Sequence, residues 1–308
     1  MWSWGQNTFG QLGDGSAMDR SSPAQVPGLN NVIAVAAGYY HSVALKRDGT
    51  VWTWGDNSYG QLGDGSSDKH ASPVQVRTIG GIQSISGGAY HTLALTQDGT
   101  VWAWGDNYFG ELGYGSSANT LNTPVMVTNV SKVKQVAAGY NYSFALTESG
   151  SLWSWGANSS GQLGIGSTND QKLPTMLTGL GEIASISAGN SHAAAVTKDG
   201  QVLTWGTNGS GELGIGSVDG HIFPQKVNEL QDVVSVTAAF NFTFAVKKRR
   251  HGLLVGQQCL RAVGRHYPFE SEFAGSHDGN GSGFRCCSSA RLRSGTAVGN
   301  CRRTFGRR

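Results

Sequence analysis

The sequence predicts an all-β protein built mainly as a β-propeller of four-stranded blades, followed by an irregular C-terminal tail. Three observations lead to this fold class. Residues 1–248 contain five tandem units of about 50 residues. Within each unit, apolar residues alternate with a period of two, which is typical of strands. The 308 residues include 46 glycines and nine tryptophans but only 14% charged residues, a composition typical of turn-rich β proteins.

The repeat is marked by a Trp-Gly pair that recurs at spacings of 50, 50, 51 and 50 residues. An asparagine follows two residues after each glycine, and a Gly-Gln/Glu-Leu-Gly motif comes shortly after it. One unit is too small to bury its own apolar face, so successive units must stack on one another. We expect the tryptophan side chains to fill the layers between blades. These tryptophans are Trp4, Trp54, Trp104, Trp155 and Trp205.

The second unit contains the four strands expected of one blade. Alternating segments cover residues 51–54, 74–76 and 82–85, and a fourth short strand covers residues 91–95. The Asp48-Gly49 dipeptide predicts a two-residue hairpin with a type I′ turn. In this division of the chain, the hairpin joins the last strand of one blade to the first strand of the next blade.

Two segments resemble the regulator of chromosome condensation repeat. Gly38 to Leu45 has the pattern Gly-x-x-His-x-x-Ala-Leu, and Asp48 to Gly63 reads DGTVWTWGDNSYGQLG. The resemblance covers residues 1–248, and the regular, cysteine-free units look like the bacterial members of the family. It implies a propeller that typically has seven blades, so five units predict an incomplete ring. Kelch repeats have a similar period, but their recurrent Gly-Gly pair is missing from most units here.

The tail, residues 249–308, differs sharply from the repeats. Residues 1–248 carry 12 Lys and Arg against 17 Asp and Glu, whereas the tail carries 11 arginines against three acidic residues. It also contains all four cysteines, Cys259, Cys286, Cys287 and Cys301. One interpretation is a genuine basic tail that binds an acidic partner or nucleic acid.

We favour a second hypothesis, in which the tail is an out-of-frame sixth repeat that is disordered or poorly structured. A one-base shift over residues 249–266 admits codons for the family motif, including a tryptophan codon at Val255. The coding DNA would test this reading. At the other end of the chain, Met1 takes the place that Val51 has in the second unit. This suggests either a strand-swapped closure of the ring or a start codon inside a longer gene.

Histidines at one repeat position are the first candidates for chemistry. His41, His91 and His192 share that position, but the other two units have Tyr142 and Phe242 there. Because phenylalanine cannot replace a metal ligand or a general base, we interpret these histidines as structural and hydrogen-bonded. The glycine-rich loops precede no helical pattern, so we interpret them as turns and not as phosphate-binding loops. The sequence therefore predicts no catalytic residue, no metal site and no cofactor.

Aromatic residues in otherwise regular loops are the candidate binding residues, because tyrosine and tryptophan dominate interaction hot spots. One group lies one or two residues before the histidine position, and the other lies in the Asn-x-x-Gly loops. The alternative is that these side chains pack as staples at the blade edges. The candidates are Tyr39, Tyr40, Tyr90, Tyr140, Phe240, Phe9, Tyr59, Tyr108 and Phe109.

The function we predict is that of a non-catalytic interaction scaffold that binds a protein partner through loops on one propeller face. The resemblance implies an alternative, a guanine nucleotide exchange factor for a small GTPase, which is the activity of the family's namesake. The acidic repeats disfavour nucleic acid as a partner, and the namesake's exchange residues have no clear counterparts here. A hydrolase sited in the propeller channel has no support, because no convergent acid, base or metal set is visible.

The sequence gives little information on location. No apolar run approaches 18 residues, so we expect no membrane span, and no signal peptide is visible. Analogy with bacterial family members favours an extracellular or cell-surface location, with the cytoplasm as the alternative.

Overall fold

The computed structural model describes residues 1–248 and 252–255. These residues belong to one compact unit, Met1–Gln258, whereas the second unit, Cys259–Arg308, lies outside the described residues. The regular elements of the described residues are all β-strands. Among these residues there is no helix of the length and apolarity needed to cross a membrane.

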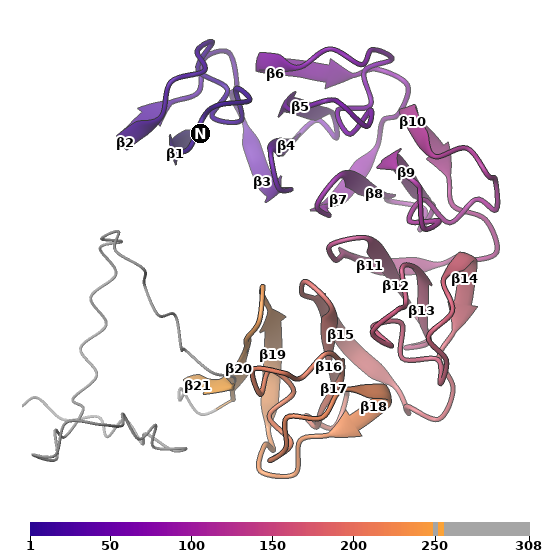
Figure 1. The fold of residues 1–308 in the computed structure, drawn as a ribbon. Helices are drawn as coiled ribbons and strands as arrows, with labels where there is room; N and C mark the ends of the chain where they lie inside the picture. The colour runs from indigo at the N-terminus through magenta and orange to yellow at the C-terminus, as the bar shows by residue number, and fades with distance from the viewer. Residues whose placement is uncertain (249–251, 256–308) are drawn as a thin grey trace, which may run out of the picture. The chain divides into compact units, whose positions relative to one another are not determined.

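Twenty-one strands form six antiparallel sheets, four of which have four strands each (Figure 1). The first complete sheet contains β3 (Val32–Ala37), β4 (His41–Lys46), β5 (Val51–Gly55) and β6 (His70–Val76). The second contains β7 (Ile82–Gly87), β8 (His91–Thr96), β9 (Val101–Asp106) and β10 (Thr120–Met126). The third contains β11 (Val133–Ala138), β12 (Tyr142–Thr147), β13 (Leu152–Gly156) and β14 (Gln171–Met176). The fourth contains β15 (Ile183–Ala188), β16 (His192–Thr197), β17 (Val202–Gly206) and β18 (His221–Lys226).

Two smaller sheets flank these four. A two-stranded sheet contains β1 (Trp2–Gly5) and β2 (Arg20–Gln25), and a three-stranded sheet contains β19 (Val233–Ala238), β20 (Thr243–Lys247) and β21 (Gly252–Val255). Figure 1 shows the sheets of this unit following one another round an arc. In each complete sheet the first strand lies on the inner side and the fourth strand on the outer side. The predicted all-β propeller of four-stranded blades is confirmed, while the number of blades in a closed ring stays a prediction.

The predicted boundary between blades is wrong. β4 and β5, on either side of Asp48-Gly49, are neighbours in one sheet, with Leu45 opposite Val51. The chain passes to the next sheet between β6 and β7, through residues 77–81. Each sheet therefore takes its first two strands from the end of one sequence unit and its last two strands from the start of the next unit. A repeat period determines how many strands recur, but not the strand at which a sheet begins.

The turn at Asp48-Gly49 also differs from the prediction, because its loop has three residues. The Gly49 N–H donates to the Lys46 carbonyl and the Lys46 N–H donates to the Thr50 carbonyl, each at 3.0 Å. A type I′ turn needs positive φ at both central residues. Here Gly49 has a φ of 77°, whereas Asp48 has no positive φ. The glycine is needed because it closes the loop in the left-handed region.

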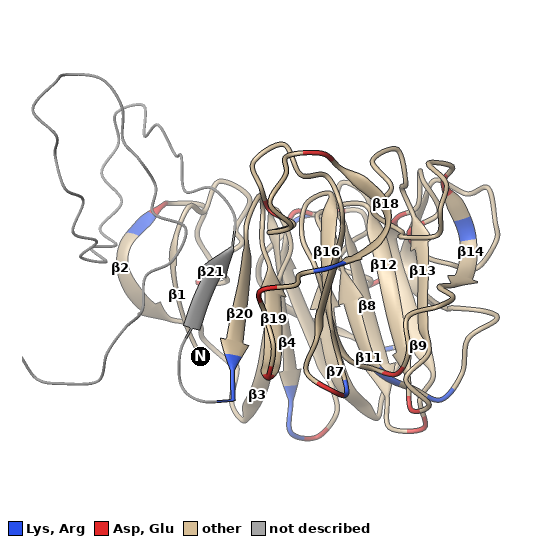
Figure 2. Cartoon of the chain, turned by 90° about the horizontal axis from the view of Figure 1, so that it is seen from below, with Lys and Arg blue, Asp and Glu red and all other residues tan. Residues whose placement is uncertain are grey.

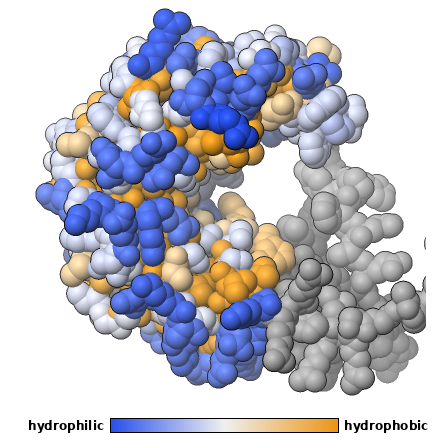
Figure 3. Space-filling model, turned by 180° about the vertical axis from the view of Figure 1, so that it is seen from behind, coloured by the Kyte–Doolittle hydropathy of each residue, from blue (hydrophilic) through white to orange (hydrophobic). Residues whose placement is uncertain are grey.

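The core consists of apolar layers between successive sheets. Trp54, Trp104, Trp155 and Trp205 are at most 1% exposed. Each donates its indole N–H to the carbonyl of the Gln or Glu in the Gly-Gln/Glu-Leu-Gly motif of the preceding unit, at 2.7–2.9 Å. The motif also leaves room for the ring, because a Cβ at Gly63 would lie 2.6 Å from the Nε1 atom of Trp104. Seen from behind in Figure 3, apolar side chains lie mostly along the inner side of the arc.

Trp4 does not share this environment, so the prediction that all five tryptophans lie between blades is wrong for it. Its side chain is 60% exposed. The physical reason is that a buried tryptophan is covered by the glycine-rich loop of the preceding unit. Among the described residues, no such loop precedes Trp4 in the chain.

β21 lies within the segment that the sequence analysis assigned to the tail. It pairs with β20 and places Val255 opposite Thr243. The same register in the fourth complete sheet places Trp205 opposite Ala193. Val255 thus occupies the backbone position of the repeat tryptophan, the residue that the shifted reading frame admits there. Residues 249–251 and 256–308 lie outside the described residues, so the frameshift and the predicted disorder stay predictions.

Candidate functional site

In each complete sheet, a hairpin joins the first strand to the second. The tips of these hairpins carry the central candidate residues. Tyr39 and Tyr40 lie between β3 and β4, where the Gly38 N–H donates to the His41 carbonyl at 2.9 Å. Backbone hydrogen bonds connect the tips of successive sheets. The N–H of Tyr39 donates to the carbonyl of Ala89, and the N–H of Ala89 donates to the carbonyl of Tyr140, both at 3.0 Å. This ladder holds the tips of three sheets side by side.

Six aromatic side chains from three successive units meet at these tips, and we call this set the aromatic face. The Tyr39 ring lies 6.0 Å from that of Tyr90 and 5.6 Å from that of Tyr140, and Tyr90 and Tyr140 lie 6.0 Å apart. Such centroid distances are typical of interacting aromatic pairs. Tyr39 is 46% exposed and Tyr59 is 40% exposed. The members are Phe9, Tyr39, Tyr40, Tyr59, Tyr90 and Tyr140.

Phe9 and Tyr59 reach this set from two other loops. Phe9 lies between β1 and β2, and Tyr59 lies at the corresponding place between β5 and β6. The Phe9 ring lies 4.5 Å from Tyr40, and the Tyr59 ring lies 5.0 Å from Tyr90. The Gln61 side chain fixes the backbone at Tyr59, because its Oε1 accepts the Tyr59 N–H at 2.8 Å. The aromatic face is therefore built on loops whose backbones are held by side-chain hydrogen bonds.

The structure does not bring the other three candidate aromatics into this set. Tyr108 and Phe109 pack edge to face with each other, with ring centroids 5.0 Å apart, and Tyr108 is 65% exposed. Phe240 is 56% exposed and has no aromatic neighbour among the described residues. For these three residues, both the binding role and the staple alternative stay predictions.

A buried pair of carboxyl groups, which was not predicted from the sequence, lies beside this face. In the second unit, the Nε2 of Gln61 donates to the Oδ2 of Asp56 at 2.7 Å. In the third unit, Asp106 takes the place of Asp56 and Glu111 takes the place of Gln61, so a donor is replaced by a second acid. Glu111 is fully buried, and its Oε1 has no hydrogen-bond partner in the described residues. The signal was the change from Gln to Glu within the repeat motif.

Burial and the nearby Asp106 carboxylate together raise the pKa of Glu111 to about 8. Burial also raises the pKa of Asp106 above its ordinary value. Glu111 is therefore a neutral acid at pH 7. Its protonated carboxyl group can act as a donor in the way that the Gln61 amide does in the second unit.

The three histidines bridge successive sheets. Their Nε2 atoms lie 2.9–3.0 Å from the hydroxyl oxygens of Thr92, Ser143 and Thr243, for His41, His91 and His192 respectively. The Thr92 hydroxyl gives its own proton to the Gln61 carbonyl at 3.1 Å, so the imidazole N–H must be the donor to Thr92. Each Nδ1 is buried without a partner in the described residues. Tyr142 bridges differently, since its hydroxyl donates to the His192 carbonyl at 2.6 Å.

We expect these three imidazoles to stay neutral from pH 8 down to pH 5. Burial lowers the pKa of His41 and His192 to about 4 and that of His91 to about 3. The folded state therefore loses stability as the pH falls from about 6.5, the ordinary value, toward about 4. Proton NMR of the Cε1–H resonances checks this, with the urea-unfolded chain as the control. A midpoint near 6.5 for any of the three in the folded protein would contradict the assignment.

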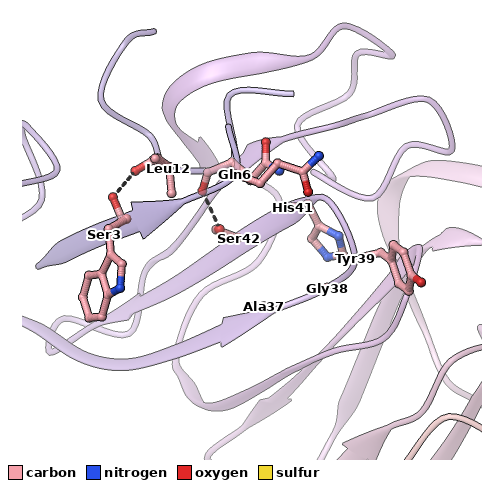
Figure 4. A pocket seen from close by; sticks show the side chains of 10 residues that line it. Ser3, Gln6, Leu12, Ala37, Gly38, Tyr39, His41 and Ser42 are labelled. Carbon is pink, nitrogen blue, oxygen red and sulfur yellow. Dashed lines mark hydrogen bonds between the residues drawn. The ribbon is translucent and has the colours of Figure 1, made fainter. Parts of the chain in front are cut away.

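A pocket of about 390 Å³ lies next to the aromatic face (Figure 4). One wall comes from β1 and the loop that follows it. The other wall comes from β3, β4 and the hairpin tip between them. Tyr39 and His41 both line it. The Ser42 hydroxyl donates across it to the Gln11 carbonyl at 2.8 Å. No group of three His, Cys, Asp or Glu among the described residues is placed to hold a metal ion.

Charged residues lie mainly at or near the two ends of the strands (Figure 2). The loops beside the aromatic face, residues 6–20, 56–69 and 106–119, carry seven acidic and two basic residues. Asp14 pairs with Arg20, and hydrogen bonds from Ser16 hold the pKa of Asp14 near 2 despite the opposing effect of burial. The aromatic face therefore lies among acidic loops.

Comparison with known proteins places this architecture in a family. A family model described as RCC1-like domain matches residues 1–272, and thus extends beyond Lys248. The chain belongs to the RCC1-like domain family. The family resemblance seen in the sequence is confirmed, while the likeness to bacterial members stays a prediction.

Individual proteins resemble this chain in sequence or in fold. The chain is 33% identical over 172 residues to the ultraviolet-B receptor UVR8 of Arabidopsis thaliana, which covers 54% of this chain and 28% of UVR8. The crystal structure of human WBSCR16 matches with a TM-score of 0.72 and 27% identity, over 80% of this chain and 67% of that one. Prp20p from Saccharomyces cerevisiae, which was studied for its binding to Gsp1p and histones, matches with a TM-score of 0.68 and 25% identity, over 78% and 60%.

Proposed function

We propose that this RCC1-like propeller is a non-catalytic interaction scaffold that binds a protein partner through the aromatic face. The observation that carries the proposal is the convergence of six aromatic side chains from three units, two of which are at least 40% exposed. Exposed aromatic clusters on rigid loops are typical of interaction hot spots. The repeat histidines form hydrogen bonds between successive sheets, which supports a structural role for them.

The test compares partner capture by the native chain and by a Tyr39→Ala/Tyr90→Ala double variant. Removing two hot-spot tyrosines is expected to weaken binding by about 30-fold or more. The matched control is Phe223→Ala, which removes an aromatic side chain that is 57% exposed on β18, outside the aromatic face. A protein retained by the native chain and the control but lost by the double variant supports the proposal. Equal capture by all three chains contradicts it.

A second candidate function is guanine nucleotide exchange on a small GTPase. It is favoured by the similarity to Prp20p, whose binding to Gsp1p has been studied. The direct assay is the release of a fluorescent guanine nucleotide from a purified small GTPase in the presence of this chain. Accelerated release would assign exchange activity, whereas binding without accelerated release would support the scaffold.

A further inference from the structure

We propose that the partner presents arginine or lysine side chains to the aromatic face, so that the face is a receptor for a basic protein segment. This inference rests on the proposed function and adds the chemistry of the partner. Two features carry it: the aspartates next to the tips that carry Tyr40 and Tyr90, and the excess of acidic residues in the surrounding loops.

Two aspartates are hydrogen-bonded through their backbones to the tyrosine-bearing tips. The backbone N–H of Asp56 donates to the Tyr40 carbonyl, and that of Asp106 donates to the Tyr90 carbonyl, both at 2.9 Å. Both aspartates are buried, at 6% and 7% exposure. Hydrogen bonds hold their carboxyl groups in place, since Ser58 and Gln61 donate to Asp56 and the Tyr108 N–H donates to Asp106. Neither aspartate forms an ion pair with a basic side chain in the described part of the chain.

These aspartates lie next to the tips that carry Tyr40 and Tyr90, whereas Ala157 lies next to the tip that carries Tyr140. The residues in the same repeat position in the other units are Gln6, Ala157 and Thr207. In the fourth unit the hairpin tip carries Asn190 and Ser191 in place of the tyrosines. Aromatic rings and aspartates therefore coincide at two of the three tyrosine-bearing tips.

The Tyr90 ring contributes no charge. Burial and a hydrogen bond with Tyr140 raise the pKa of Tyr90 above its ordinary value, so this phenol is neutral throughout the physiological range. The face of a neutral phenol ring attracts a cation within about 6 Å of its centroid. A guanidinium group suits this geometry best, because it is planar and can stack on a ring while pairing with a carboxylate.

The surrounding loops reinforce this preference. Apart from the neutral Glu111, their six acidic residues exceed the two basic ones, so they attract a basic partner and repel the phosphates of nucleic acids. Asp68 is exposed on one of these loops and has no basic partner in the described structure. It therefore provides a carboxylate that can be changed without disturbing the core.

The experiment titrates the full chain into two fluorescent dodecapeptides, one of alternating arginine and serine and one of alternating glutamine and serine. We expect the arginine peptide to bind and the glutamine peptide not to bind, with affinity that falls as salt rises from 50 to 300 mM. Replacing Tyr39 and Tyr90 with alanine is expected to weaken binding about three- to thirty-fold. Asp68→Asn is expected to weaken it about two- to five-fold at low salt.

Two control variants separate specific from general attraction. Phe223→Ala removes an exposed aromatic outside the face, and Glu229→Gln removes an exposed acid at the opposite end of the strands. Both are expected to bind like the native chain. The proposal is overturned if the double tyrosine variant binds the arginine peptide as well as Phe223→Ala does, or if an oligothymidylate binds the face in preference to the peptide.

The outcome also separates this inference from the proposed function. Suppose that a captured partner requires Tyr39 and Tyr90 but binds equally well at both salt concentrations. This result would support the proposed scaffold function and overturn the inference that the partner is basic. A partner that binds the Tyr39→Ala/Tyr90→Ala variant as well as the native chain would overturn the proposed function itself.

Discussion

Replacing Glu111 with glutamine is expected to stabilise the protein by several kcal/mol at pH 8 and above, with almost no effect near pH 4.5. The folded state holds the proton of Glu111 up to a pKa of about 8, whereas the unfolded chain releases it near the ordinary value of 4.5. The native chain therefore loses stability as the pH rises between these values, by up to about 1.4 kcal/mol per pH unit. Glutamine does not ionise and supplies a donor to Asp106, as Gln61 does for Asp56.

Chemical denaturation of both proteins at pH 5, 7 and 9 measures this difference. Glu212→Gln is the matched control, because Glu212 is also buried in the same repeat motif but has Thr207 where Glu111 has Asp106. We expect a smaller and flatter gain for the control. If Glu111→Gln stabilises the protein equally at pH 5 and pH 9, ionisation of Glu111 is not the source of the gain.

Replacing Trp155 with alanine is expected to cost about 3–5 kcal/mol of unfolding free energy. Its side chain is fully buried between two sheets, and its indole N–H donates to the Glu111 carbonyl at 2.7 Å. The substitution leaves a large cavity and removes this hydrogen bond. Trp4→Ala provides the comparison within the same chain, since Trp4 has the same repeat position but is 60% exposed.

Thermal and chemical denaturation of the two variants checks this expectation. Trp4→Ala should change the unfolding free energy by less than about 1 kcal/mol. Similar losses for both variants would show that the layer around Trp155 relaxes to fill the space, or that the Trp4 side chain is covered in solution.

Much of the fold could be predicted because the repeat carries several independent signals. The alternation within 51–54 and 91–95, the tryptophan period and the glycine loops all indicate four short strands per unit. The start of each sheet could not be predicted, because any four consecutive strands of a periodic chain satisfy the same pattern. The backbone pairing of Leu45 with Val51 resolves this choice. The Asp48-Gly49 turn was ambiguous for a related reason, since a glycine with positive φ suits both two-residue and three-residue loops.

The candidate site was predicted in part. Sequence position alone identified Tyr39 and Tyr140 as candidates. It did not show that the backbone ladder through Ala89 brings the two hairpin tips together, with the rings 5.6 Å apart. The same reasoning grouped Phe240 with them, although its side chain stands apart. Glu111 was overlooked because Gln and Glu are interchangeable in a pattern and differ only when their buried environment is known.

The offset between sequence unit and sheet has a consequence for how such a gene can change. If residues 51–100 were lost, β4 would be followed by the 101–106 and 120–126 strands, and these would complete a four-stranded sheet of the usual order. If residues 77–126 were lost instead, one whole sheet would disappear and its neighbours would meet. Recombination between repeats therefore adds or removes complete blades wherever the breakpoint falls, so blade number can evolve without passing through a half-built sheet.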